Sequence, residues 1–187
     1  MTIDIGTGDG RAVLATAAAE PASLAIGLDA DAASMAESSR RAARSPRRGG
    51  LPNALFVVAA AEDLPTELAG LATRVTIRMP WGSLLRGCLG GDPIVAAGIA
   101  GLLAPGGSLE LVLAPATRDG IDRLALTPDG VRAAVAQAFG PLGLRVVRCR
   151  PASTDELRAT RSSWARRLLA GGTVDRTAIL AELGLRS

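Results

Sequence analysis

Three glycines near the N-terminus stand where a chain can turn tightly around a ligand. In DIGTGDG they occupy positions 6, 8 and 10, between an apolar run and an alanine-rich run. Glycine lacks a Cβ, so its backbone can bend sharply and approach a ligand closely. Asp29 ends the next apolar run about 20 residues on, where a carboxylate can hold a ribose hydroxyl pair. This pattern indicates a site for a nucleoside-containing cofactor; the alternative is a turn set by packing alone.

Acidic side chains around this loop favour one cofactor over another. A dinucleotide places its pyrophosphate at the start of the following helix. Asp9 lies within the loop, and its carboxylate would repel a pyrophosphate. A sulfonium ligand with an amino-acid tail suits this charge better, and Asp4 could bind the ammonium group of such a tail. The residues therefore favour S-adenosylmethionine over NAD.

Apolar runs that alternate with helical patterns predict an α/β fold. Strands are expected at residues 2–5, 23–29, 54–61, 75–79, 108–114, 144–150 and 177–183. Helices are expected at 11–20, 31–44, 93–107 and 127–143, with a loop at 45–53 and an arginine-containing connection at 151–172. Nearly continuous apolar strands favour a mostly parallel sheet of seven strands covered on both faces. The last two strands have no long crossover helix between them, which predicts an antiparallel strand at the edge.

Length and composition exclude several classes of protein. The 187 residues suffice for one well-buried domain. No apolar run approaches the roughly 18 residues of a membrane span, and the N-terminus lacks a signal-peptide pattern. We therefore expect a cytoplasmic protein without a membrane partner, and a monomer. With two cysteines, Cys88 and Cys149, and no histidine, we expect no metal site and two free, buried thiols.

Six motifs together make the sequence resemble one family. DIGTGDGR, GLDAD, GGLPN, AAAEDLP, MPWGSLLRG and SSWARRL follow one another as in the aminoglycoside-resistance 16S rRNA (adenine(1408)-N(1))-methyltransferases of the Kam/Npm type. The resemblance covers nearly the whole chain, and MPWGSLLRG and SSWARRL are its most specific parts. It implies a class I, Rossmann-like methyltransferase fold and S-adenosylmethionine as cofactor. It also implies that the partner is 16S rRNA in the small ribosomal subunit, with N1 of a decoding-site adenine as target.

The same resemblance implies which residues bind the cofactor. Asp4, Gly6 and Gly8 resemble contacts to the methionine part, and Asp29 resembles the ribose contact. The remaining cofactor residues implied by the motifs are Ala61 and Glu62, beside the adenine ring, and Ser83, near the methyl group.

A flipped adenine would explain the two tryptophans. Trp81 lies between a proline and a glycine at the mouth of a strand, and the resemblance pairs it with Trp164 around the target base, with Ser162 beside them. An adenine presents N1 to an enzyme only after leaving its helix, and stacking contributes about 1–3 kcal/mol per base. Adenine N1 carries a lone pair in the neutral base, so attack needs no general base. The alternatives are that Trp81 covers the rim of the core and that Trp164 belongs to an amphipathic helix.

Arginines gather in two stretches of about ten residues each, following the second and sixth strands. The first stretch holds Arg40, Arg41, Arg44, Arg47 and Arg48, and the second holds Arg158, Arg161, Arg166 and Arg167. The resemblance places Arg167 and Arg176 near the target nucleotide. Contacts to rRNA phosphates would weaken as salt rises. For the first stretch, the alternative is a solvated helix end favoured by the helix dipole.

Two features depart from the family. Members carry an extension ahead of the first strand that forms a hairpin, whereas residues 1–187 read as a single methyltransferase domain that begins on the strand. Arg78 stands where the family usually has an apolar residue, and the sequence gives no account of it. Two other functions remain open. One is a small-molecule methyltransferase, which would need an enclosed pocket, and the other is a weakly active or non-catalytic rRNA-binding homologue.

Overall fold

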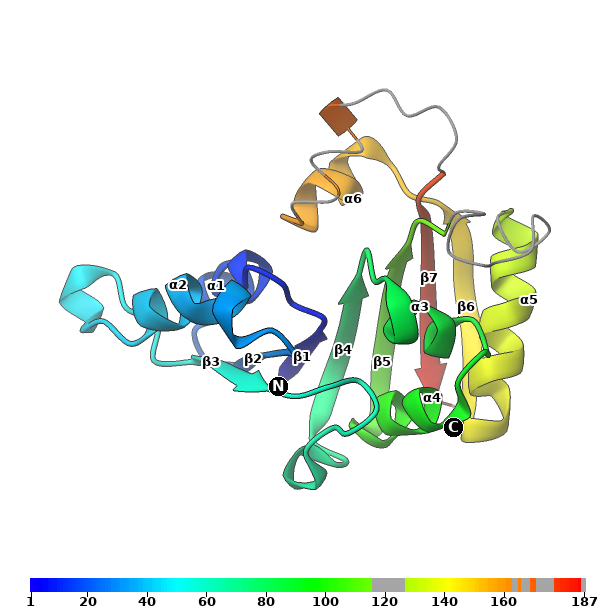
Figure 1. The fold of residues 1–187 in the computed structure, drawn as a ribbon, viewed down its shortest axis with the longest axis horizontal. Coiled ribbons are helices and arrows are strands. Elements are labelled where there is room, and N and C mark those ends of the chain that lie inside the picture. The colour runs from blue at the N-terminus through cyan, green and yellow to red at the C-terminus, as the bar shows by residue number, and fades with distance from the viewer. Residues whose placement is uncertain (116–126, 163–164, 166–168, 171–176, 186–187) are drawn as a thin grey trace.

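One mixed sheet organises the chain (Figure 1). The structure is a computed structural model that describes all residues except 116–126, 163–164, 166–168, 171–176 and 186–187. Within the described residues the sheet has seven strands in the order β3-β2-β1-β4-β5-β7-β6. They are β1 (Thr2–Ile5), β2 (Ala25–Asp29), β3 (Ala54–Val58), β4 (Ala72–Arg78), β5 (Leu103–Leu113), β6 (Leu144–Pro151) and β7 (Ile179–Leu185). Strands β1 to β5 pair in parallel, as the sequence predicts.

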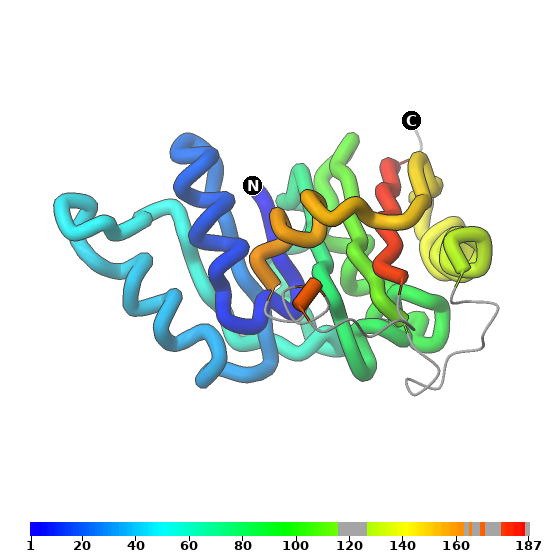
Figure 2. The backbone as a smooth tube through the Cα atoms, turned by 90° about the horizontal axis from the view of Figure 1, so that it is seen from above, coloured from blue at the N-terminus to red at the C-terminus, as the bar shows by residue number. Residues whose placement is uncertain are grey.

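Helices pack against this sheet in two groups. The α-helices are α1 (Arg11–Ala19), α2 (Ala32–Ala42), α3 (Gly82–Cys88), α4 (Pro93–Gly101), α5 (Pro128–Phe139) and α6 (Thr154–Ala159). Short 3-10 helices are η1 (Pro46–Arg48), η2 (Thr66–Leu68) and η5 (Gly140–Leu142). An alanine-rich cluster joins α1 and α2 to β2 and β3, while the main core lies between the sheet and α3, α4 and α5. Figure 2 shows α2 and α5 at opposite ends of the sheet.

Residue patterns explain most of these elements. In β5, Leu109, Leu111 and Leu113 are fully buried on one face of the sheet, as period-two alternation requires. Helix starts are capped by side-chain oxygens: Asp31 accepts from the Ala33 amide at the start of α2, and Thr127 accepts from the Gly130 amide at the start of α5. These patterns account for the strands and helices that the sequence predicts.

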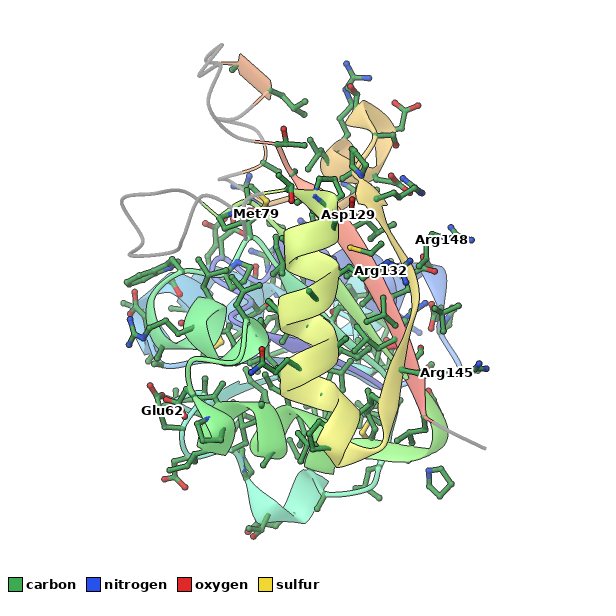
Figure 3. The ribbon with its side chains drawn as sticks, turned by 90° about the vertical axis from the view of Figure 1, so that its right-hand side faces the viewer. Glu62, Met79, Asp129, Arg132, Arg145 and Arg148 are labelled. Atoms are coloured by element: carbon green, nitrogen blue, oxygen red, sulfur yellow. The ribbon has the colours of Figure 1, made fainter. Side chains whose placement is uncertain are left out.

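The last strand lies elsewhere than expected. Strand β7 is antiparallel, but it pairs with β5 on one side and β6 on the other, so the edge strand is β6. Along the chain β6 follows β5 and α5, yet in the sheet β7 lies between β5 and β6. Arg145 and Arg148 are exposed on β6 (Figure 3), and charged side chains on an edge strand oppose pairing with another sheet.

Three local expectations are wrong. The helix expected at 93–107 ends at Gly101, and Leu103 already pairs with Ala72 at the start of β5. Pro105 cannot continue a helix, and the strand partner decides the conformation. The other two errors are omissions. No helix is expected at α3, which buries Leu84, Leu85 and Cys88, and the connection expected at 151–172 contains α6.

The composition predicts two free, buried thiols and no membrane span. Both cysteines are free. Cys88 is fully buried, and burial raises its pKa to about 12, so the thiol is neutral and packs as an apolar group. Cys149 is only partly buried, and its thiol donates to the carbonyl oxygen of Pro128 at 3.4 Å. Among the helices that the structure describes, none is both long and apolar enough to cross a membrane.

Candidate active site

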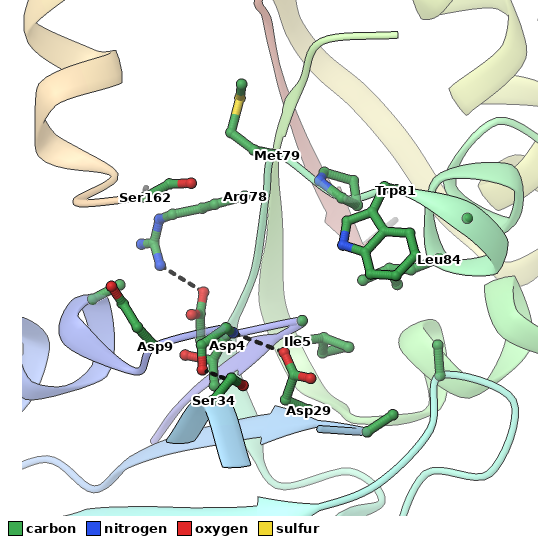
Figure 4. A pocket seen from close by; sticks show the side chains of 18 of the residues that line it. Asp4, Ile5, Asp9, Asp29, Ser34, Arg78, Met79, Trp81, Leu84 and Ser162 are labelled. Atoms are coloured by element: carbon green, nitrogen blue, oxygen red, sulfur yellow. Dashed lines mark hydrogen bonds and ion pairs between the residues drawn. The ribbon is translucent and has the colours of Figure 1, made fainter. Parts of the chain in front are cut away.

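A cavity of about 420 Å³ opens at the carboxyl ends of β1, β2 and β4 (Figure 4). In open α/β sheets this is the edge at which ligands bind. Segments after β3 and α6 complete its walls. The residues with predicted roles that line it are Asp4, Gly6, Gly8, Asp29, Ala61, Glu62, Trp81, Ser83, Arg161 and Ser162. The structure thus brings together every predicted cofactor residue and part of the predicted adenine clamp.

The glycine loop has the left-handed backbone that its residues allow. Gly6 and Gly8 have φ angles of 68° and 57°. A Cβ on Gly6 would lie 2.8 Å from Cδ2 of Leu84, whereas a Cβ on Gly8 would meet no atom within 4 Å. Glycine is therefore favoured at both positions by φ, and at Gly6 a Cβ would also displace the Leu84 methyl group.

Asp29 is held in place by the loop that it faces. Its Oδ2 accepts from the Gly8 amide at 2.7 Å, and its Oδ1 accepts from the Asp31 amide at 2.9 Å. Each carboxylate oxygen can accept a further hydrogen bond, which suits a pair of ribose hydroxyls. Ser34, which the sequence analysis did not single out, donates to the Gly8 carbonyl at 3.0 Å. Its signal was its place in the first turn of the helix after Asp29.

Asp4 is buried at the floor of the cavity and has two side-chain partners. Its Oδ1 accepts from the Thr76 hydroxyl at 2.5 Å and from Nη1 of Arg78 at 2.6 Å. The parallel register of β1 and β4 sets Asp4 opposite Thr76. Arg78, unexplained by the sequence, is thus the ion-pair partner of the residue predicted to bind the ammonium group.

Trp81 stands on the rim of the cavity rather than in the core. It is the N-cap residue of α3, and 75% of its surface is exposed. An indole so exposed contributes little to core packing and is free to stack on a ligand. Met79 nearby has a φ of 55°, a strained value for a residue with a Cβ. Strain of this kind concentrates at functional sites.

Glu62 and Ser83 form the opposite wall. The Ser83 side chain hydrogen-bonds to the Glu62 carboxylate and, with the backbone amide of Glu62, lowers the pKa of this carboxyl. Glu62 is therefore ionised at neutral pH. Ser83 lies in the first turn of α3, so the same turn that exposes Trp81 also fixes this acidic group.

Helix α6 precedes and anchors the segment that forms the last side of the cavity. Ser153 and Glu156 form a capping box at its start. Arg150 on β6 binds both oxygens of Glu156, at 2.8 and 2.5 Å, and this pair lowers the pKa of Glu156 to about 2. Leu157 packs with Met79 and neighbouring apolar residues from β5 and β7. The segment that follows α6 brings Thr160, Arg161 and Ser162 to the cavity.

Several predicted RNA contacts lie away from the cavity or outside the described residues. Those outside are Trp164, Arg166, Arg167 and Arg176. The first arginine cluster is exposed at the C-terminal end of α2 and along η1: Arg40, Arg41, Arg44, Arg47 and Arg48. The other end of α2 reaches the cavity through Ser34, so these arginines lie about a helix length from it. Both proposed roles of the cluster, phosphate contact and solvated helix end, stay open.

The charge of the cavity fits S-adenosylmethionine. Four carboxylates line it, those of Asp4, Asp9, Asp29 and Glu62, and they suit a ligand that carries a sulfonium and an ammonium group. Thr7 in the glycine loop also lines the cavity, and its buried hydroxyl has no hydrogen-bond partner among the described residues. Among the residues that the structure describes, no group of three or more side chains could hold a metal ion.

The sheet with its inserted antiparallel last strand, together with a glycine loop and an acid ending β2, defines a class I S-adenosylmethionine-dependent methyltransferase. Comparison with known proteins gives the family. The model of the NpmA family, 16S rRNA (adenine(1408)-N(1))-methyltransferase, matches residues 1–183. The chain belongs to this family.

Individual relatives agree with that family. The chain is 36% identical over 189 residues to the 16S rRNA (adenine(1408)-N(1))-methyltransferase of Streptoalloteichus tenebrarius. This match covers 98% of this chain and 86% of the relative. The solved structure of the 16S rRNA methyltransferase KamB has a TM-score of 0.88 at 33% identity, covering 100% of this chain and 87% of that one. The solved structure of a mutant of the Catenulisporales acidiphilia enzyme with cosubstrate SAM has a TM-score of 0.86 at 33% identity. The match covers 100% of this chain and 85% of that one.

Proposed function

We propose that this protein methylates N1 of a flipped-out adenine in the 16S rRNA decoding site, using S-adenosylmethionine, and thereby gives aminoglycoside resistance. The observation that carries the proposal is a cavity in which the glycine loop, Asp29 and the exposed Trp81 meet. A rim on which Trp81 is three-quarters exposed suits a base that enters from an RNA surface better than an enclosed small molecule.

Positioning is the main work of the residues. When bound, S-adenosylmethionine supplies an electrophilic methyl group on its sulfonium. Asp29 binds the ribose of the cofactor and Asp4 binds its ammonium group. Because N1 of neutral adenine already carries a lone pair, the site needs only to align the base with the methyl carbon, and no side chain has to remove a proton.

Trp81 supports the base and favours the product. Unstacking an adenine costs a few kcal/mol, and stacking on an indole returns about 1–3 kcal/mol. The methylated base is a cation, and aromatic faces attract cations. We extend this role to Trp164, with Ser162 beside it, as the second half of the clamp.

Docking on the subunit is assigned to the arginines. Arg161, at the cavity, and the exposed cluster at the end of α2 contact rRNA phosphates, which position a protein without taking part in the reaction. We assign the same role to Arg166, Arg167 and Arg176, which lie outside the described residues. The enzyme acts in the cytoplasm, as a monomer and without a metal ion.

Transfer of labelled methyl groups to purified ribosomal subunits tests the proposal. We expect label in small subunits, none in large subunits, and loss of transfer in Asp29→Ala. Arg74→Met is a matched control, because Arg74 pairs with Glu20 at 2.6 Å outside the cavity and should keep full activity. A wild-type protein that binds S-adenosylmethionine but labels no small subunits would be a non-catalytic homologue, contrary to the proposal.

A further inference from the structure

We propose that Arg78 binds the α-carboxylate of the cofactor while Asp4 binds its ammonium group. The pair would then recognise the zwitterionic end of the amino-acid tail and select for ligands that carry both groups. This inference rests on the proposed cofactor site and adds a specificity-determining residue to it.

The Arg78–Asp4 pair is a fixed feature of the cavity floor (Figure 4). Nη1 of Arg78 lies 2.6 Å from Oδ1 of Asp4, and it also donates to the Thr76 hydroxyl at 3.0 Å. The side chains of Arg78 and Asp4 are 17% and 7% exposed. Arg78 lies two residues after Thr76, the register partner of Asp4, so all three side chains share one face of the sheet. Two charges held this way need no reorganisation to meet a ligand.

Both members of the pair keep bonding capacity on the cavity side. Within the described residues, the side-chain hydrogen bonds of Arg78 all leave from Nη1, and those of the Asp4 side chain all end on Oδ1. Among the described residues, no other side-chain polar atom of Arg78 or Asp4 is buried without a hydrogen-bond partner. Both residues line the cavity. Nε and Nη2 of Arg78 thus remain as donors, the geometry that a carboxylate matches. Oδ2 of Asp4 remains as an acceptor for an ammonium group.

Charge in the cavity makes such a cation necessary. The cavity is lined by four carboxylates, and its basic residues in the described segments are Arg78 and Arg161. A ligand carboxylate placed near Asp4 would be repelled unless a cation stood beside it, because like charges in contact disfavour each other. Arg78 is the cation that contacts Asp4. The neutral Arg78–Asp4 pair therefore complements the neutral ammonium–carboxylate pair of the cofactor.

Two ligands that differ only in the carboxylate test this inference. Decarboxylated S-adenosylmethionine keeps the sulfonium and the ammonium group but lacks the α-carboxylate. By titration calorimetry, wild-type protein should bind S-adenosylmethionine about tenfold or more tightly than the decarboxylated ligand, as expected for a charge-assisted hydrogen bond. Arg78→Met should remove this preference by weakening S-adenosylmethionine alone. Arg74→Met, on the same strand but outside the cavity, should leave both affinities unchanged.

Each other outcome overturns the inference in a recognisable way. If Arg78→Met weakens both ligands equally, Arg78 only orients Asp4. If the substitution strengthens both, Arg78 competes with the ammonium group. Should Arg78→Met fail to fold by circular dichroism, the wild-type comparison still decides, since equal affinity for the two ligands contradicts a carboxylate contact. Wild-type protein that binds neither ligand would instead refute the cofactor site itself.

Discussion

Trp81→Ala should leave the fold nearly intact while slowing methyl transfer. The side chain is 75% exposed at the start of α3, so little of its surface contributes to the core. A fully buried indole removes roughly 200 Å² from water. A quarter of that area is about 50 Å², which contributes about 1 kcal/mol to the free energy of unfolding at 25 cal/mol per Å².

The effect on the reaction should be larger than the effect on stability. Losing a stacking contact of about 1–3 kcal/mol lowers the rate roughly five- to 150-fold at 1.36 kcal/mol per decade. Trp81→Phe should retain part of the rate, because a phenyl ring still offers an aromatic face. Subunit affinity should change little, since the phosphate contacts remain.

The assay is single-turnover methylation of small subunits with enzyme in excess, beside a competition binding measurement and a thermal melt. These readouts separate base stacking from docking and from folding. A folded Trp81→Ala protein that methylates at the wild-type rate would refute the stacking role and leave the indole as an exposed rim residue.

Three further predictions follow from other contacts. Asp29→Ala should weaken S-adenosylmethionine binding about tenfold or more in calorimetry, because it removes charge-assisted hydrogen bonds; unchanged affinity would disprove the ribose contact. Glu156→Gln should lower the melting temperature at neutral pH. The pKa of Glu156 is lowered from 4.5 to about 2, so the stabilisation is complete above pH 4.5 and is lost as pH falls toward 2; melts that differ equally across this range would contradict the ion pair. Changing Arg44, Arg47 and Arg48 together to Glu should reduce subunit binding and its salt dependence while cofactor affinity stays; an unchanged salt slope would identify a solvated surface.

Local patterns predicted that residues after the first two strands lie together at one cavity. The glycines at 6 and 8 follow the first strand and Asp29 ends the second. In a parallel sheet adjacent strand ends meet at one edge, so their proximity follows from the order of elements. The hydrogen bond from the Gly8 amide to Asp29 joins the segments at these two strand ends.

Contacts between distant strands could not be predicted in the same way. The pairing of Asp4 with Arg78 depends on the register of β1 against β4, which no local pattern encodes. The insertion of β7 between β5 and β6 likewise depends on which space the earlier strands leave. Helix α3 has seven residues and includes two glycines, which is too short a pattern to predict a helix, although this helix positions Trp81 and Ser83.

The most direct test of the central claim is the chemical identity and place of the methylated base. Small subunits methylated by the wild-type protein should yield N1-methyladenosine by mass spectrometry of digested rRNA. Reverse transcription should stop at one decoding-site adenine, because a methyl group on N1 blocks the pairing edge. Methylation on the exocyclic amine, at another site, or only on free rRNA would contradict a cavity built to present N1 of a flipped adenine.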